Sequence, residues 1–143
     1  MLSHGGFGFQ PFSPEKKDAE LFAYLRKSQS FFVQNISQGI TQLEEEGAIQ
    51  VLHAAGGGKQ ELILAAVGQL QFDVVQFRLN SEYGVETRLE MLSHRIARWV
   101  TEGHDALKKR RPELEILTLI VQDRWFRPVL LFKSEWHLQK VEQ

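Results

Sequence analysis

The segment AAVGQLQFDVVQFRLNSEYGVE, residues 65–86, is the most informative stretch for the fold of this chain. It begins inside residues 62–67, a nearly continuous apolar run that is typical of a strand covered on both faces, and Gly68 breaks this run. A helix is predicted over residues 69–83, and Gly84 is placed to end it in the left-handed conformation. The segment therefore predicts a buried strand, a glycine turn and a helix with a defined end.

The predicted helix 69–83 carries more apolar surface than one sheet can cover. At about 100° per residue, its apolar side chains fall into two stripes, one made of Leu70, Val74 and Phe77 and the other of Phe72, Val75, Leu79 and Tyr83. One stripe can cover the sheet of the helix itself, so the other needs a second partner. We therefore expect this helix to be sandwiched between two layers.

The elements around this helix predict an α+β fold. Hydrophobic periodicity indicates a helix over residues 28–46, ended by Gly47, and strands over residues 21–26, 48–53, 61–67 and 85–92. The turn of a hairpin is expected at Gly56, Gly57 and Gly58. The order βαββαβ is the split ferredoxin-like arrangement, in which two helices cover one face of an antiparallel sheet.

The last third of the chain predicts a smaller α+β extension. A strand is indicated over residues 96–101, followed by a short helix over residues 105–111 that Pro112 ends. Residues 114–121 and 129–132 are typical of a hairpin, and Ser134 is placed to cap a last helix. We expect this extension to pack against the first part and to cover the second stripe of helix 69–83.

The chain is predicted to form one domain after a short lead. Residues 1–10 show no periodicity and are expected to be irregular. We assign residues 1–15 to an irregular lead and residues 16–143 to a single α+β domain, with sub-parts at about 20–92 and 93–143. No low-complexity linker divides the chain.

Composition excludes several classes of function. The 143 residues include no Cys, which rules out disulfides and thiolate metal sites. Lys and Arg number 17 against 18 Asp and Glu, so a nucleic-acid partner would need a local basic patch. No apolar run approaches the ~20 residues of a transmembrane helix, and no secretory signal is present. These features predict a soluble cytoplasmic protein without a membrane partner.

Catalytic and metal-binding motifs are not found. The run Gly56-Gly57-Gly58-Lys59-Gln60 lacks the Gly-Lys-Ser/Thr ending and the following helix that a phosphate loop needs. No serine lies in a nucleophile-elbow pattern, and no pair of carboxylates suggests an acid and a base. The histidines show no metal-ligand spacing: His4, His53, His94, His104 and His137. We therefore expect no catalytic residue, no metal and no cofactor in this chain.

Two groups of residues are candidates for binding. The basic run Lys108, Lys109, Arg110 and Arg111 could neutralise RNA phosphates, although four cations at the end of a helix also complement its dipole. Arg124 and Arg127 flank Trp125 and Phe126 on a predicted hairpin tip, and loop tips often carry binding residues. On the strand before them, Arg98 and Trp99 alternate, and we expect Trp99 to face inward.

Several motifs of this sequence resemble one protein family. Residues 68–86 fit the pattern GxLQFDVVxxRLxSEYxVE, residues 42–51 read QLEEEGAIQV, and residues 97–100 read ARWV. With the FxPE of residues 12–15, these motifs resemble the C-terminal domain, domain III, of the class II peptide chain release factors of the release factor 3 type. The positions that match the family motifs are Gln42, Glu46, Gly47, Gly68, Gln69, Gln71, Phe72, Asp73, Arg78, Glu82, Tyr83, Arg98 and Trp99.

The resemblance implies a role in translation termination. The family consists of translational GTPases of the elongation factor G group, with a GTP-binding domain, a β-barrel domain and this domain. Its members bind the ribosome and help class I release factors to leave after peptide release. The GTPase motifs are missing here, so GTP and Mg²⁺ are expected only on the absent GTP-binding domain. The chain is then either an excised last domain or a stand-alone relative.

The partners that the resemblance implies are the ribosome, through rRNA and ribosomal protein, a class I release factor, and the GTPase and barrel domains of the same protein. DNA and membranes are not expected. The family-motif residues along helix 69–83 are interpreted as serving either packing or interdomain contact.

Two other classes of function remain open at the level of the sequence. The same split fold could serve as a regulatory domain that binds a small molecule or a protein, often between two copies. A small acyl- or phosphoryl-transfer enzyme would need a loop that presents N–H groups and an arginine to an anion, and the glycines beside Lys59 are the nearest match. One scaffold hosts many functions, so the fold does not decide among these classes.

Overall fold

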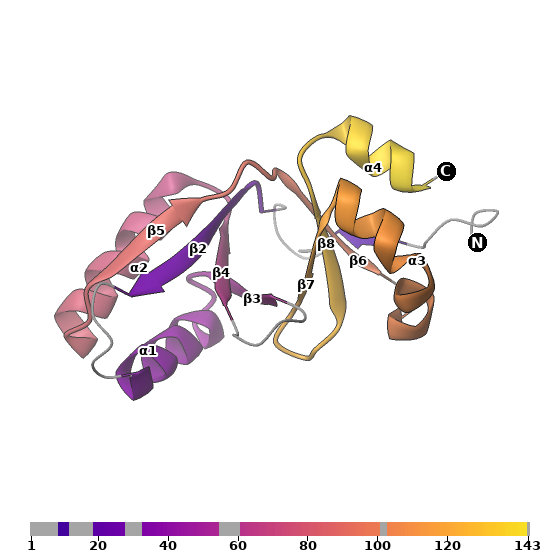
Figure 1. Cartoon of the computed structure of the whole chain (residues 1–143). Helices are drawn as coiled ribbons and strands as arrows, with labels where there is room; N and C mark the ends of the chain where they lie inside the picture. The colour runs from indigo at the N-terminus through magenta and orange to yellow at the C-terminus, as the bar shows by residue number, and fades with distance from the viewer. Residues whose placement is uncertain (1–8, 12–18, 28–32, 55–60, 101–102, 143) are drawn as a thin grey trace.

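The computed structural model of the chain describes residues 9–11, 19–27, 33–54, 61–100 and 103–142 (Figure 1). These residues form eight strands and four helices. In chain order the elements are β1 (Phe9–Pro11), β2 (Leu21–Lys27), α1 (Val33–Glu45), β3 (Gln50–Ala54), β4 (Leu62–Ala66), α2 (Gln69–Tyr83), β5 (Thr87–Met91), β6 (Ile96–Val100), α3 (Gly103–Leu117), β7 (Leu119–Gln122), β8 (Pro128–Phe132) and α4 (Glu135–Glu142).

All described strands belong to one antiparallel sheet in the order β1-β6-β8-β7-β3-β4-β2-β5. In its first half, β2 lies between β4 and β5, and α1 and α2 lie on the same face, which is the predicted split βαββαβ arrangement. The predicted α+β class and ferredoxin-like architecture are confirmed. The second half, β6 to α4, continues the same sheet through β7, which pairs with β3 at two positions, His53↔Gln122 and Ala54↔Val121.

The core consists of three clusters on the two faces of this sheet. A first outer cluster lies beneath α1 and α2 and includes Ile40, Leu43, Leu64, Phe72 and Leu79. A second outer cluster lies beneath α3 and α4 and includes Leu107, Leu114, Leu130, Phe132 and Val141. The central cluster lies on the face away from the helices and takes residues from both halves, including Phe22, Leu52, Ile63, Val121, Val129 and Leu131.

The central cluster shows how the two halves are joined. Ile63 and Leu131 are fully buried although they point away from all four helices, so the uncovered faces of the two halves pack against each other. Figure 1 shows the consequence, with α1 and α2 at one end of the molecule and α3 and α4 at the other. Burial on both faces explains the continuous apolar runs of β4 and β8.

The prediction that α2 is sandwiched between two layers is wrong. Its buried residues are Phe72, Val75 and Leu79, which face α1, β4 and β5. The other stripe is exposed, with 73% of Leu70, 43% of Val74 and 70% of Phe77 accessible to solvent. The extension packs against the central cluster instead of α2, because periodicity shows that a second stripe exists but not what lies over it.

The helix around Pro112 also differs from the prediction. Instead of ending at residue 111, α3 continues through Pro112, and the strand predicted over residues 114–121 shrinks to β7. Proline removes one backbone hydrogen bond from a helix interior. Leu107 and Leu114 lie on the same face of α3 and are both buried in the second outer cluster, and this packing offsets the cost.

Other predictions fall at the edges of the described residues. Residues 1–10 were expected to be irregular, but Phe9–Pro11 form β1 and pair with β6. The glycine turn at residues 56–58, the beginning of the helix predicted from residue 28 and the motif of residues 12–15 lie outside the described residues. None of the helices in the described part of the chain is long and apolar enough to span a bilayer.

Candidate functional site

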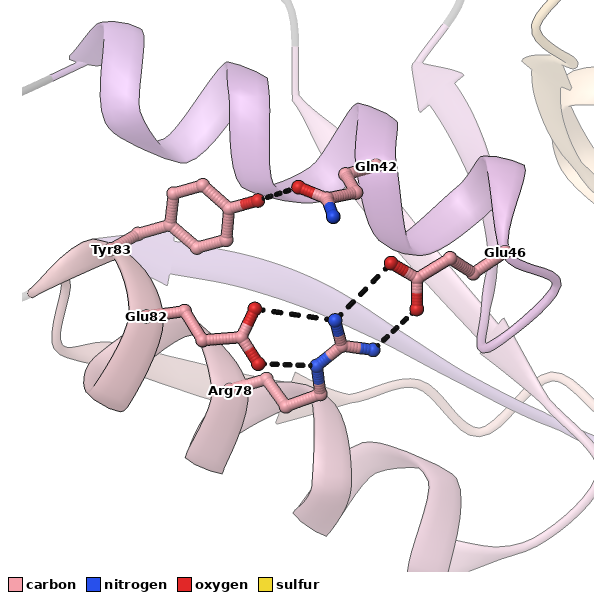
Figure 2. A network of polar contacts seen from close by, with 5 residues as sticks. All are labelled: Gln42, Glu46, Arg78, Glu82 and Tyr83. Atoms are coloured by element: carbon pink, nitrogen blue, oxygen red, sulfur yellow. Dashed lines mark hydrogen bonds and ion pairs between the residues drawn. The ribbon is translucent and has the colours of Figure 1, made fainter.

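Five of the thirteen family-motif residues hold α1 and α2 together (Figure 2). Arg78, on α2, donates from Nε to Glu82 at 2.7 Å and from Nη1 to Glu46, at the end of α1, at 2.6 Å. Its Nη2 reaches the second oxygen of each carboxylate, at 3.2 Å in both cases. Beside it, the Tyr83 hydroxyl donates to Gln42. These side chains join the two helices across their solvent-facing seam.

The charges of this seam stabilise one another. Hydrogen bonds from Arg78 lower the pKa of the carboxyl groups of Glu46 and Glu82, and these bonds raise the pKa of the guanidinium. All three side chains remain partly exposed, so solvent screens the interaction. The group is therefore a connection between helices and not a set of charges available to a ligand.

The beginning of α2 is held by a second set of motif residues. The Gln71 side chain accepts a hydrogen bond from Val67 N at 2.6 Å and from Gly68 N at 3.4 Å, and it donates to Ala48 O at 3.1 Å. The amide thus joins the end of β4 to the loop between α1 and β3. Gly47 and Gly84 have φ of 79° and 66°, which other residues adopt at a cost. Phe72 is fully buried.

Two further motif residues lie on the exposed side of α2. Gln69 donates to the Asp73 carboxylate at 3.3 Å, and both side chains are exposed. They border three exposed apolar residues of α2, Leu70, Val74 and Phe77, which we call the outward stripe. The structure therefore separates the motif residues into those that join elements and those that surround an exposed apolar surface.

The basic run of α3 is not a set of four equivalent cations. Arg110 pairs with Glu113 at 2.8 Å and Arg111 pairs with Glu115 at 2.7 Å, while Lys108 and Lys109 are exposed. Arg110 also donates to Val141 O at 3.3 Å, which links α3 to α4. Because α3 continues to Leu117, the run lies in the middle of the helix, and its interpretation as a complement to the helix end is wrong.

The turn between β7 and β8, residues 123–127, is organised around one buried carboxylate. Asp123 is 3% exposed and accepts hydrogen bonds from Trp125 N and Arg127 N, both at 2.9 Å, and from Trp99 Nε1 at 2.9 Å. Arg127 Nε donates to it at 2.7 Å. Four donors on one side chain that is almost inaccessible to water give the turn a defined shape. We call residues 123–127 the tip.

The tip presents its aromatic side chains to solvent. Trp125 is 61% exposed and Phe126 is 65% exposed. Phe126 has φ 65°, the only positive φ of a non-glycine residue in the described part of the chain. For an aromatic residue this conformation costs roughly 1–2 kcal/mol, and it persists where surrounding contacts impose it. Strain of this kind is concentrated at functional sites.

The arginines of the tip form a stack with Trp125 and with Trp99 of β6. The Arg127 guanidinium lies over the Trp99 ring at 4.4 Å and over the Trp125 ring at 4.8 Å, and Arg124 lies over Trp125 at 4.9 Å. Trp99 packs against the central cluster, as predicted, while Arg98 donates to Ala97 O at 2.8 Å. The stack continues from the buried core of the molecule to its surface.

The tip lies close to the end of α1. Burial raises the pKa of the Glu44 carboxyl, and the positive charge of Arg124 acts in the opposite direction. Glu44 also accepts a hydrogen bond from Val51 N at 3.2 Å. The structure therefore brings the predicted binding residues Arg124 and Arg127 together, but it leaves the basic run of α3 as a separate group.

Asp123 is the residue that sequence reasoning missed. The arginines and aromatics of the turn were recognised, but the side chain that holds them was not among the candidates. An aspartate at the first position of a turn that contains two exposed aromatics was the available signal, because aspartate commonly accepts hydrogen bonds from the backbone two residues later.

Comparison with known proteins gives a consistent match along the chain. The family model described as class II release factor RF3, C-terminal domain, matches residues 11–142. Peptide chain release factor 3 of Synechocystis sp. is 53% identical over 130 residues, which are 91% of this chain and 22% of that protein.

Further relatives show the same coverage. Peptide chain release factor 3 of Microcystis aeruginosa is 52% identical over 136 residues, 95% of this chain and 24% of that protein. The corresponding protein of Cyanothece sp. is 51% identical over 134 residues, 94% of this chain and 23% of that protein. The chain therefore spans less than a quarter of the length of these curated relatives. With the family model covering nearly all of its residues, the chain belongs to the family of class II release factor RF3 C-terminal domains.

Proposed function

We propose that this chain is the docking domain of a translation termination GTPase and that its tip contacts the ribosome. The observation that carries the proposal is the tip itself, where Asp123 holds Trp125 and Phe126 in exposed positions. The family that the chain belongs to gives the setting, because its relatives are named peptide chain release factors.

The chemistry of the tip suits a binding surface. Tryptophan and arginine are enriched among the residues that contribute most to interfaces. Aromatic rings and arginine planes also stack on unpaired RNA bases. Because the buried carboxylate already orders the turn, binding would not have to immobilise it, and the entropic cost of docking is reduced.

The family of the chain suggests a role for this docking in the whole protein. We infer that docking contributes to the recycling of class I release factors, with the class I factor as a second partner. The reaction would be carried out by the GTP-binding domain, where GTP and Mg²⁺ would bind. The chain alone is then expected to hydrolyse no GTP above background, and a turnover assay on the purified chain checks this.

Co-sedimentation with ribosomes tests the tip directly. The purified chain would be pelleted with ribosomes over a salt series, with and without a class I release factor. We expect Trp125→Ala with Phe126→Ala to bind about 30-fold more weakly, since the truncation of central interface residues costs about 2 kcal/mol. A matched control is Trp136→Ala, which removes an exposed tryptophan of α4 that is 56% accessible.

The same assay separates the tip from the basic run. The variant Lys108→Glu with Lys109→Glu would lower binding in a strongly salt-dependent way if α3 also contacts RNA phosphates. Unchanged pelleting of the tip variant would contradict the proposal. So would the absence of pelleting both for the chain alone and for a full-length chimera in which it replaces the matching segment of the Synechocystis relative.

A further inference from the structure

The outward stripe of α2 is an apolar surface with a regular geometry. Leu70, Val74 and Phe77 follow one another at the spacing of one helix face, and 73%, 43% and 70% of their surfaces are exposed. At about 100° per residue, this face lies opposite the one that carries Phe72 and Leu79. A partner that covers the stripe would therefore lie as a further layer over the helices, on the side away from the sheet.

The surroundings of the stripe are unsuited to nucleic acid. Arg78, the only Lys or Arg of α2, already contacts the carboxylates of Glu46 and Glu82. On the other side, Asp73 accepts a hydrogen bond from Gln69 and carries a negative charge. Phosphate groups bind to cations that are free of other partners. Here the positive charge of Arg78 is already neutralised by carboxylates, and Asp73 would repel a phosphate. The stripe instead fits an uncharged apolar protein surface.

Its small area favours a covalently linked partner over a second copy. Three side chains of this size present roughly 300 Å² of apolar surface, whereas stable complexes of separate proteins bury about 800 Å² on each partner. A linked domain is present at an effective concentration in the millimolar range, so a smaller contact is enough. The relatives offer such partners, because this chain matches only 22–24% of their length.

We propose that in full-length members of this family the outward stripe of α2 is covered by an apolar surface of another domain of the same polypeptide. The seam of Arg78, Glu46 and Glu82 would then hold α1 and α2 as the rigid base for this contact. The inference concerns a surface on a different part of the molecule from the tip, so it does not depend on the ribosome contact proposed above.

Thiol labelling measures whether the stripe is covered. The chain contains no cysteine, so Val74→Cys introduces a single probe at the centre of the stripe. Its reaction with a maleimide would be followed, by mass spectrometry of the peptide that carries it, in the isolated chain and in the full-length chimera with the Synechocystis relative. The control is Ile116→Cys on α3, at a position that is 83% exposed.

We expect Val74→Cys to react about tenfold more slowly in the chimera than in the isolated chain, because a face that is covered nine-tenths of the time reacts only in the remaining tenth. Ile116→Cys should react equally fast in both. Adding Leu70→Gln and Phe77→Gln to the chimera should restore fast labelling at position 74, since these changes make the stripe polar while its helix stays intact.

Two results would overturn the proposal. The first is equal labelling of Val74→Cys in the chimera and the isolated chain. The second is slow labelling of the isolated chain that becomes slower with protein concentration, which would identify a second copy as the partner. Neither result tests the ribosome contact of the tip, which is measured separately by co-sedimentation of the tip variants with ribosomes.

Discussion

The helix pair α1–α2 and the tip each contain one side chain with several ionic or hydrogen-bonded partners, but these side chains do different work. Arg78 is partly exposed to solvent and joins two helices in which no described non-glycine residue has a positive φ. Asp123 is buried and holds a turn that contains a strained Phe126. A side chain with several polar contacts can thus either join two elements or position other side chains for a partner. Burial and backbone strain distinguish the second use from the first.

The largest effect on stability is expected when a phenylalanine of the buried face of α2 is truncated and compared with one of the exposed face. Phe72→Ala should lower the free energy of unfolding by about 3–5 kcal/mol, because it leaves a cavity at a position that is 0% exposed. Phe77→Ala removes the same side chain from the outward stripe and should change stability by less than about 0.5 kcal/mol. Urea denaturation of both variants checks this, and similar costs would mean that the outward stripe is packed in the isolated chain.

The second largest loss of stability is expected at the tip. Asp123→Ala leaves the donors of Trp99, Trp125 and Arg127 without their acceptor, and we expect a loss of about 2–3 kcal/mol. The matched control is Glu90→Ala, which removes an exposed carboxylate of the edge strand β5 that pairs with Arg26 on β2. Its cost should stay below about 1 kcal/mol. Thermal and urea unfolding of both variants measures the two losses. If Asp123→Ala and Glu90→Ala lower the free energy of unfolding equally, the distinction between buried and exposed polar groups is contradicted.

Phe126→Gly should raise the free energy of unfolding, in contrast to the variants above. Glycine adopts φ 65° without strain, so the variant should be more stable by about 0.5–1 kcal/mol. Phe126→Ala keeps the strained conformation and should show no such gain. If the tip is a docking surface, Phe126→Gly should also bind ribosomes more weakly, which couples higher stability to lower function. A variant that gains stability and binds normally would count against a role of this side chain in docking.

The smallest effect is the pH dependence of the helix seam. Arg78 lowers the pKa of Glu46 and Glu82 in the folded chain, so their stabilisation is complete above the ordinary carboxyl pKa and is lost as the pH falls through the folded values. Arg78→Gln should therefore lose less stability than the unmodified chain when the pH is lowered from 7 to about 3. Denaturation curves at several pH values give the free energy of unfolding of both chains as a function of pH. If it falls equally with pH in both, the seam does not contribute to the pH dependence of stability.

Sequence reasoning was most accurate where local patterns suffice. The bounds of α2, its end at Gly84 and the split βαββαβ order were predicted, because periodicity and a left-handed glycine depend on neighbours in the chain. The same reasoning failed at Pro112, since burial of Leu107 and Leu114 outweighs a missing hydrogen bond. It also assigned no role to Asp123, whose partner Trp99 lies 24 positions away.

The sequence by itself thus determined the elements of the first half, the two stripes of α2 and the motifs that place the chain in its family. Only the tertiary structure decided which stripe is buried, how the halves share a central cluster, and that Arg124 and Arg127 surround an ordered aromatic turn. The physical reason is that a helix or strand follows from neighbouring residues. Which surface covers it depends on contacts between distant residues, and these form only when the layers pack.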